Sequence, residues 1–125
     1  MDIYQEHIVE HAKHPRNAGR LKAPTHREHA RNPLCGDEAE IFLNVKKGAL
    51  ADIGYEIQGC ILSKAALSIV SEHVKGKKLA AIAKFGASDV FGLLGFTPTP
   101  SRTRCALFGF EAGQALARQI LRGKT

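Results

Sequence analysis

"EIFLNVKKGALADIGYEI", residues 40–57, decides the fold of this chain. Apolar and polar residues alternate on both sides of Lys47-Gly48. The alternating apolar residues are Ile41, Leu43 and Val45 before the pair, and Ile53, Tyr55 and Ile57 after it. A period of two is typical of a half-buried strand, and a Lys-Gly pair supplies a tight turn. The stretch therefore predicts a β-hairpin that packs one face against a core.

Helical periodicity replaces this alternation on both sides of the hairpin. Upstream, Asp2 and Gln5 form a capping-box pattern, and the run that follows ends at His14-Pro15. Residues 15–38 are turn-rich and polar, with room for a short strand. Downstream we expect helices from about 61 to 76, over 77–85, over 88–94, and from Arg102 or Thr103 to Arg122. One helix, a small antiparallel sheet and several more helices make an α+β fold, in one domain over residues 1–125.

The composition argues against some classes of partner. The chain has 125 residues, of which 44% are hydrophobic and 24% charged, as is usual for soluble proteins. Its net charge is +6, but the basic residues are spread along the chain, and two Tyr with no Trp leave little for base stacking. We therefore expect a solvated basic surface, or one that fits an acidic protein, and no nucleic acid.

The chain lacks the marks of a membrane or secreted protein. No apolar run approaches the roughly 20 residues of a membrane span. The start, residues 1–6, lacks the basic-then-apolar layout of a signal peptide. We expect a cytoplasmic protein without membrane contact, in which three scattered cysteines indicate metal-binding or reactive thiols. An inert buried cysteine is the alternative for any one of them alone.

All three cysteines lie at the ends of predicted elements. Cys35 lies in a Pro/Gly loop before the hairpin, Cys60 lies between the hairpin and a helix, and Cys105 lies in the first turn of the last helix. Because a hairpin folds back on itself, Cys35 and Cys60 should emerge at the same end of the sheet. The free N–H groups at a helix start favour a thiolate. Asp37 offers a fourth ligand, with an Asx turn or strand cap as the alternative. Three thiolates and a carboxylate suit zinc or iron–sulfur chemistry.

The first predicted helix contains a second possible metal-binding motif. His7, Glu10 and His11 match the H-x-x-E-H pattern of inverzincin metallopeptidases. Those enzymes are larger and need a further ligand from a distant helix. We therefore expect a solvated helix face with one histidine packed near the helix end.

Motifs along nearly the whole chain resemble the iron–sulfur cluster assembly family of IscU, SufU and the NifU N-terminal domain. Those motifs are Tyr4-x-x-x-Ile8-x-x-His11 with His14-Pro15-Arg16-Asn17, Asn32-Pro33-x-Cys35-Gly36-Asp37, Gly59-Cys60-x-x-Ser63, Val74-Lys75-Gly76-Lys77, and Arg102-x-x-Cys105-Ala106-Leu107. The resemblance implies the SufE/NifU-like fold. It also implies that Cys35, Asp37, Cys60 and Cys105 bind the cluster, a 2Fe-2S cluster by expectation, or zinc in the protein as isolated.

The function that the resemblance implies is a scaffold and not a turnover enzyme. Such a scaffold accepts sulfur from a cysteine desulfurase, assembles a transient cluster, and passes it to apo iron–sulfur proteins. Cys35 or Cys105 is the expected persulfide acceptor. The alternatives are a zinc-dependent sulfurtransferase of the SufU kind that activates a desulfurase, and a structural zinc-binding interaction module.

Some positions depart from the family patterns. Residues 96–101, Phe-Thr-Pro-Thr-Pro-Ser, replace the proline-rich chaperone-recognition stretch of IscU, so an Hsp70-type chaperone is not an expected partner. Arg104 replaces a histidine ligand of IscU and resembles SufU, but the long SufU insertion between Cys60 and Cys105 is missing. The chain thus lies between subfamilies. Basic residues that flank the two cysteine-bearing helices are expected to steer the desulfurase. They are Lys75, Lys77, Arg102 and Arg104.

Overall fold

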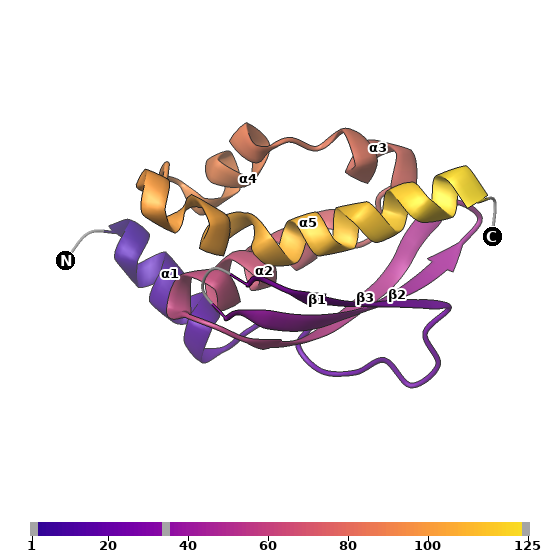
Figure 1. The fold of residues 1–125 in the computed structure, drawn as a ribbon, viewed down its shortest axis with the longest axis horizontal. Helices are drawn as coiled ribbons and strands as arrows, with labels where there is room; N and C mark the ends of the chain where they lie inside the picture. The colour runs from indigo at the N-terminus through magenta and orange to yellow at the C-terminus, as the bar shows by residue number, and fades with distance from the viewer. Residues whose placement is uncertain (1–2, 34–35, 124–125) are drawn as a thin grey trace.

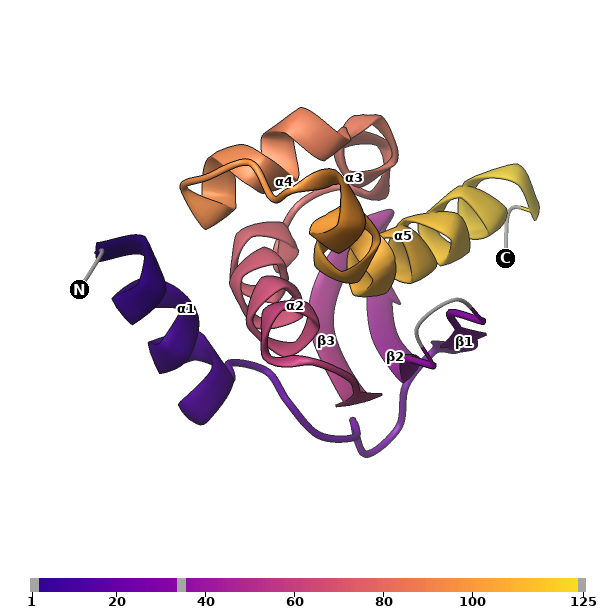
Figure 2. The same ribbon diagram turned by 60° about the vertical axis from the view of Figure 1, so that its left-hand side comes forward.

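The computed structural model describes residues 3–33 and 36–123, and it confirms the expected α+β fold (Figure 1). Three strands form one antiparallel sheet in the order β1-β2-β3. The elements in chain order are α1 (Ile3–Lys13), β1 (His26–Arg31), β2 (Glu38–Lys46), β3 (Ala49–Gln58), α2 (Ile61–Val74), α3 (Leu79–Lys84), α4 (Ala87–Leu94) and α5 (Pro100–Gly123). The helices lie on one side of the sheet, with α2 and α5 nearest to it (Figure 2). None of the described helices combines the length and the apolar character needed to cross a bilayer.

The predicted hairpin is the centre of the sheet. Ile41 pairs with Tyr55 and Leu43 with Ile53, and all four belong to the buried core. Lys47 and Gly48 have φ angles of 53° and 77°. Positive values at both positions are what a two-residue type I′ turn requires, and they match the right-handed twist of the strands.

The outer face of β2 is more buried than its alternation indicates. Phe42 points away from the helices, yet it is only 1% exposed. The guanidinium carbons of Arg20 and Arg27 lie 5.4 and 5.6 Å from the centre of its ring. Arg20 pairs with Glu56 and Arg27 pairs with Glu40, so these arginines stay over the ring. A half-buried strand was therefore an incomplete prediction at this position.

The segment after α1 is fixed to α2 and β3 by polar contacts. The Arg16 amide donates to Ser68 Oγ at 2.8 Å, and Tyr55 Oη donates to the Arg16 carbonyl at 2.7 Å. Asn17 Nδ2 donates to Ser71 Oγ at 3.0 Å. Serine is a poor choice for a helix interior, but two buried serines of α2 provide the partners of this turn. The His-Pro-Arg-Asn motif therefore joins the first helix to the sheet.

Helix α5 begins at Pro100, two residues before the earliest predicted start. Proline suits the first helical position because its missing N–H would have no partner there. Farther along, Gln114 Nε2 donates to the carbonyls of Phe85 at 2.6 Å and Ile82 at 3.0 Å, and Arg118 donates to that of Ala83 at 2.8 Å. These contacts give donors to carbonyls at the end of α3 and hold α3 against α5.

Candidate metal centre

The hairpin register brings the first two parts of the site together. Glu38 pairs with Gln58 at one end of the sheet. Asp37 therefore precedes β2 where Gly59 and Cys60 leave β3. Cys60 is the N-cap of α2, with φ −74° and ψ 169°, so its backbone is extended before the helix begins. The hairpin returns the chain to the end of the sheet from which it started, and the register shift between Asn44 and Val45 sets the pairing of Glu38 with Gln58 there.

Three of the four expected ligands converge. A carboxylate oxygen of Asp37 and the Sγ atoms of Cys60 and Cys105 all lie within 4.8 Å of one another. They come from the start of a strand, the mouth of α2 and the body of α5, which are far apart in the sequence. Cys35 lies outside the described residues. The ligand roles of all four residues stay predictions, but the geometry of these three fits a shared metal ion.

The predicted place of Cys105 in its helix is wrong. Because α5 begins at Pro100, Cys105 lies in the second turn and not in the first. The free N–H groups of a helix belong to its first four residues, so they cannot favour a Cys105 thiolate. Proline at position 100, read as part of a loop, was in fact the first residue of the helix.

Cys60 keeps the electrostatic advantage of a helix mouth. Burial raises the pKa of the Cys60 thiol, but hydrogen bonds from the backbone amides of Ser63 and Leu62 and from Cys105 outweigh burial. The pKa of Cys60 is therefore below its ordinary value. Arg102 Nη2 lies 3.9 Å from Cys60 Sγ and adds a positive charge beside the thiol. A thiol in such surroundings readily becomes the thiolate that binds metal.

Asp37 is buried in a way that fits a cation. It is only 4% exposed, and its Oδ2 atom has no hydrogen-bond partner among the residues that the structure describes. The turn itself is closed by backbone groups, since the Asn32 amide donates to the Asp37 carbonyl at 2.7 Å. A buried carboxylate oxygen without a partner costs free energy unless a cation or donor compensates it. Beside two thiols, a metal ion or an iron–sulfur cluster would do so.

Gly59 and Ser63 support this arrangement, and their roles were not foreseen. A Cβ on Gly59 would stand 2.5 Å from Ser63 Oγ and 2.8 Å from Asp37 Oδ1. Ser63 Oγ donates to the Cys60 carbonyl at 2.9 Å. The spacing Gly59-Cys60-x-x-Ser63 was noted in the sequence as a motif, but only the structure shows that the glycine leaves room for the carboxylate.

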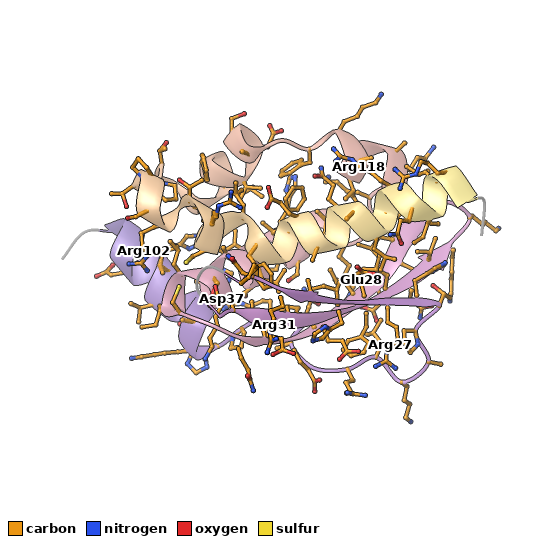
Figure 3. The ribbon with its side chains drawn as sticks, in the orientation of Figure 1. Arg27, Glu28, Arg31, Asp37, Arg102 and Arg118 are labelled. Atoms are coloured by element: carbon orange, nitrogen blue, oxygen red, sulfur yellow. The ribbon has the colours of Figure 1, made fainter. Side chains whose placement is uncertain are left out.

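The rim of the site is basic and apolar. Figure 3 shows Asp37 and Arg102 in the same half of the molecule, with Arg118 in the other half. Ile61, directly after Cys60, is 61% exposed, although large apolar side chains are usually covered. Arg102 and Ile61 thus offer a partner both charge and apolar surface beside the thiols.

The H-x-x-E-H motif serves packing. His11 is buried, its Nδ1 lies 2.8 Å from Ser68 Oγ, and the His7 ring meets it edge to face at 4.8 Å. Glu10 pairs with Arg16. Within the described ranges, the group of Asp37, Cys60 and Cys105 is the one set of three that could hold a metal ion.

Comparisons with known proteins point the same way as the site. The family model of the NifU-like N terminal domain matches residues 3–121. The iron–sulfur cluster assembly scaffold protein IscU 1 of Archaeoglobus fulgidus is 29% identical over 119 residues, which cover 95% of this chain and 75% of that protein. The zinc-dependent sulfurtransferase SufU of Bacillus subtilis is 25% identical over 127 residues, which cover 88% and 86%.

A solved structure confirms the expected fold. The N-terminal part of a nitrogen-fixing NifU-like protein from Brucella abortus superposes with a TM-score of 0.76 at 23% identity. The match covers 96% of this chain and 95% of that one.

Proposed function

The chain belongs to the NifU-like N-terminal domain family, and we propose that it is an iron–sulfur cluster assembly scaffold. It accepts sulfur from a cysteine desulfurase, assembles a transient cluster, and passes the cluster to apo-proteins in the cytoplasm. The observation that carries this proposal is the convergence of Cys60, Cys105 and the buried, unpartnered carboxylate of Asp37 from three separate elements. The cluster assembly scaffold protein IscU 1 of Archaeoglobus fulgidus, which matches 95% of this chain, supports it.

The cluster is the cargo of this scaffold, and its proposed ligands are Cys35, Asp37, Cys60 and Cys105. Thiolates bind iron strongly, and iron–sulfur clusters are held mainly by such ligands. A 2Fe-2S cluster needs four protein ligands, which equals this set. Cys60, with its lowered pKa and its fixed N-cap backbone, is proposed as a ligand throughout.

Sulfur enters by thiol chemistry on a second cysteine. The thiolate of Cys35 or Cys105 attacks the outer sulfur of the desulfurase persulfide. A new S–S bond forms on the scaffold, the S–S bond on the desulfurase breaks, and a thiolate remains there. Cys105 lies inside a helix, whereas Cys35 adjoins Gly36, which has a φ of 76° and lies in the loop before β2. These observations favour Cys35 as the acceptor.

A zinc-dependent sulfurtransferase is the second candidate. Arg104, directly before Cys105, resembles SufU, and SufU of Bacillus subtilis is among the relatives. The same residues would hold zinc in tetrahedral geometry, and zinc would keep the thiolates together until sulfur arrives. A structural zinc module is the third candidate. We expect about one zinc per chain after aerobic purification, since three thiolates bind this ion tightly.

Anaerobic reconstitution with ferrous iron, cysteine and a cysteine desulfurase tests the proposal. Cluster absorbance that disappears in Cys60→Ser supports the scaffold. Persulfide transfer with zinc retained and no cluster supports the sulfurtransferase. If neither a cluster nor persulfide transfer is observed, the structural zinc module is supported. An Hsp70-type chaperone has no part in the proposal, because residues 96–101 replace its recognition stretch.

A further inference from the structure

Eight exposed basic side chains lie at the end of the molecule away from the metal centre. They come from the β2–β3 turn, the segment after α2, and helices α3 and α5. We call this group the basic pole, and its members are Lys46, Lys47, Lys75, Lys77, Lys78, Lys84, Arg118 and Arg122. Helix α2 has 14 residues between Cys60 and Lys75, so about 21 Å separates the site from the pole.

Backbone hydrogen bonds hold the parts of the basic pole in place. The Leu50 amide donates to the Lys77 carbonyl at 2.8 Å, and the Leu79 amide donates to the Gly48 carbonyl at 2.9 Å. These bonds join the β2–β3 turn to the segment between α2 and α3. Arg118 of α5 bonds a carbonyl of α3, so the third part is joined as well. The charges therefore share one surface of fixed shape.

The charge of the basic pole is not balanced within the molecule. In the described part of the chain, Lys75 is the one member that forms an ion pair, with Asp52 at 3.2 Å. The outer face of the sheet differs, because Arg20, Arg27 and Arg31 each pair with a glutamate there. An array of like charges destabilises a fold by self-repulsion. A negatively charged partner would relieve that repulsion.

An exposed leucine lies among these charges. Leu121 is 42% exposed. It lies seven residues after Gln114 and three after Arg118, so it shares the α5 face that contacts α3. Phosphate groups make no use of such a side chain, whereas an apolar anchor inside a charged rim is typical of protein interfaces.

We propose that the basic pole is a docking surface for an acidic protein partner that places an apolar side chain on Leu121. The partner binds at the opposite end from Cys60 and Asp37, so both thiol chemistry and docking can proceed together. This surface is independent of the proposed scaffold function, because it uses none of the site residues.

Peptide and RNA probes of matched length test the proposal. One peptide of about sixteen residues contains only glutamate, and the other carries leucine at every fourth position of the same background. The third probe is an RNA of about sixteen nucleotides, which offers a similar charge without leucine. Fluorescence anisotropy at low and moderate salt gives the affinities. We expect the leucine peptide to bind about fivefold tighter than polyglutamate, and Leu121→Ser to abolish that difference.

Two triple variants separate a docking surface from net charge. Lys77, Lys78 and Lys84 are changed to Glu in the first variant. Lys13, Lys22 and Lys64, which are also exposed, are changed to Glu in the second. We expect the first variant to lose peptide binding about tenfold or more, and the second to lose about twofold. Equal losses would overturn the proposal, because binding would then follow net charge. Tighter binding of RNA than of the leucine peptide would also overturn it, since nucleic acid would be the occupant.

Discussion

Gly59 lies so close to Asp37 that a methyl group on Gly59 would stand 2.8 Å from the Oδ1 atom of the carboxylate. Cβ atoms essentially never make contacts under 3.0 Å, so either residue would have to move. Gly59 also directly precedes Cys60, which begins α2. The position of the candidate ligands thus depends on the absence of a side chain next to them.

Gly59→Ala should disturb the metal centre at once. We expect zinc affinity to fall about tenfold and the free energy of unfolding to fall by about 1–3 kcal/mol, because the site is overpacked. Competition with a chromophoric chelator and urea unfolding measure the two effects. Gly92→Ala is the matched control, since a Cβ there meets nothing within 4 Å. In helix α4 that change should stabilise by up to about 1 kcal/mol. Equal zinc affinity in both variants would show that Gly59 does not position Asp37.

Asp37→Asn should stabilise the metal-free protein while it weakens metal binding. The substitution removes a charge whose Oδ2 atom has no described partner, and such a group costs about 1–3 kcal/mol when buried. We therefore expect a higher urea midpoint without metal and a smaller increase on addition of zinc. A lower midpoint in metal-free Asp37→Asn would mean that the carboxylate already has a stabilising partner.

Charge reversal should distinguish the two ends of the molecule in desulfurase binding. Lys75 and Lys77 flank α2 as expected, but they follow its C-terminal end, whereas Cys60 lies at its N-terminal end. Arg102, whose Nη2 lies 3.9 Å from Cys60 Sγ, is at the site. Arg102→Glu with Arg104→Glu should weaken the complex about tenfold and flatten its salt dependence. Lys75→Glu with Lys77→Glu should leave it unchanged, and the opposite pattern would move the sulfur donor to the basic pole.

The protein should lose stability as the pH falls through the range in which histidine titrates. Burial lowers the pKa of His11, and the charges of Arg16 and His7 lower it further, against the opposing effect of Glu72 and Glu10. Below about pH 6.5 the unfolded chain therefore binds a proton that the native state binds only at a lower pH. The free energy of unfolding consequently decreases as the pH decreases. Urea midpoints at about pH 8 and about pH 5.5 measure this loss. His11→Asn should reduce it, and an unchanged loss would assign it to other groups.

The hairpin and helix order could be read from the sequence because each depends on local patterns. Lys47-Gly48 predicts the hairpin, but the register shifts by one residue between Asn44 and Val45, and the shifted register brings Asp37 to Gly59. The start of α5 could not be read so easily, since Pro100 suits both the end of a loop and the first position of a helix. The buried outer face at Phe42 depends on Arg20, which is distant in sequence and arrives through tertiary packing.

The sequence points to the candidate residues of the site, whose ligand roles stay predictions, but not to the way they pack. Cys60 before a helix and a loop aspartate are visible in the sequence, and the hairpin predicts that the two lie at the same end of the sheet. The burial of Asp37, with an oxygen that lacks a described partner, depends on the space that Gly59 leaves and on Ser63 of α2. Contacts of this kind join residues from separate elements, so no local sequence pattern predicts them.

Release of the cluster should depend on Asp37, which has the chemistry of a leaving ligand. A carboxylate is a harder ligand than a thiolate, so it holds iron in a sulfide-rich cluster less firmly than a fourth cysteine would. Asp37→Cys should therefore give a cluster that survives longer and transfers more slowly to an apo-ferredoxin. Asp37→Ala should also slow transfer, because the ligand that leaves first is gone.

Measured stability keeps this test independent of folding. Asp37 lies in a loop but is buried, so each variant is first compared with the native protein by its urea midpoint, and only folded protein is loaded with cluster. Transfer is then followed by the circular dichroism of the ferredoxin cluster, with Gly92→Ala as the unaffected control. Equal transfer rates in the native protein and both Asp37 variants would show that the weak ligand is not the exit. If transfer is slower in Asp37→Cys alone, a weak ligand at this position permits release. That ligand is the carboxylate in the native protein and a water molecule in Asp37→Ala.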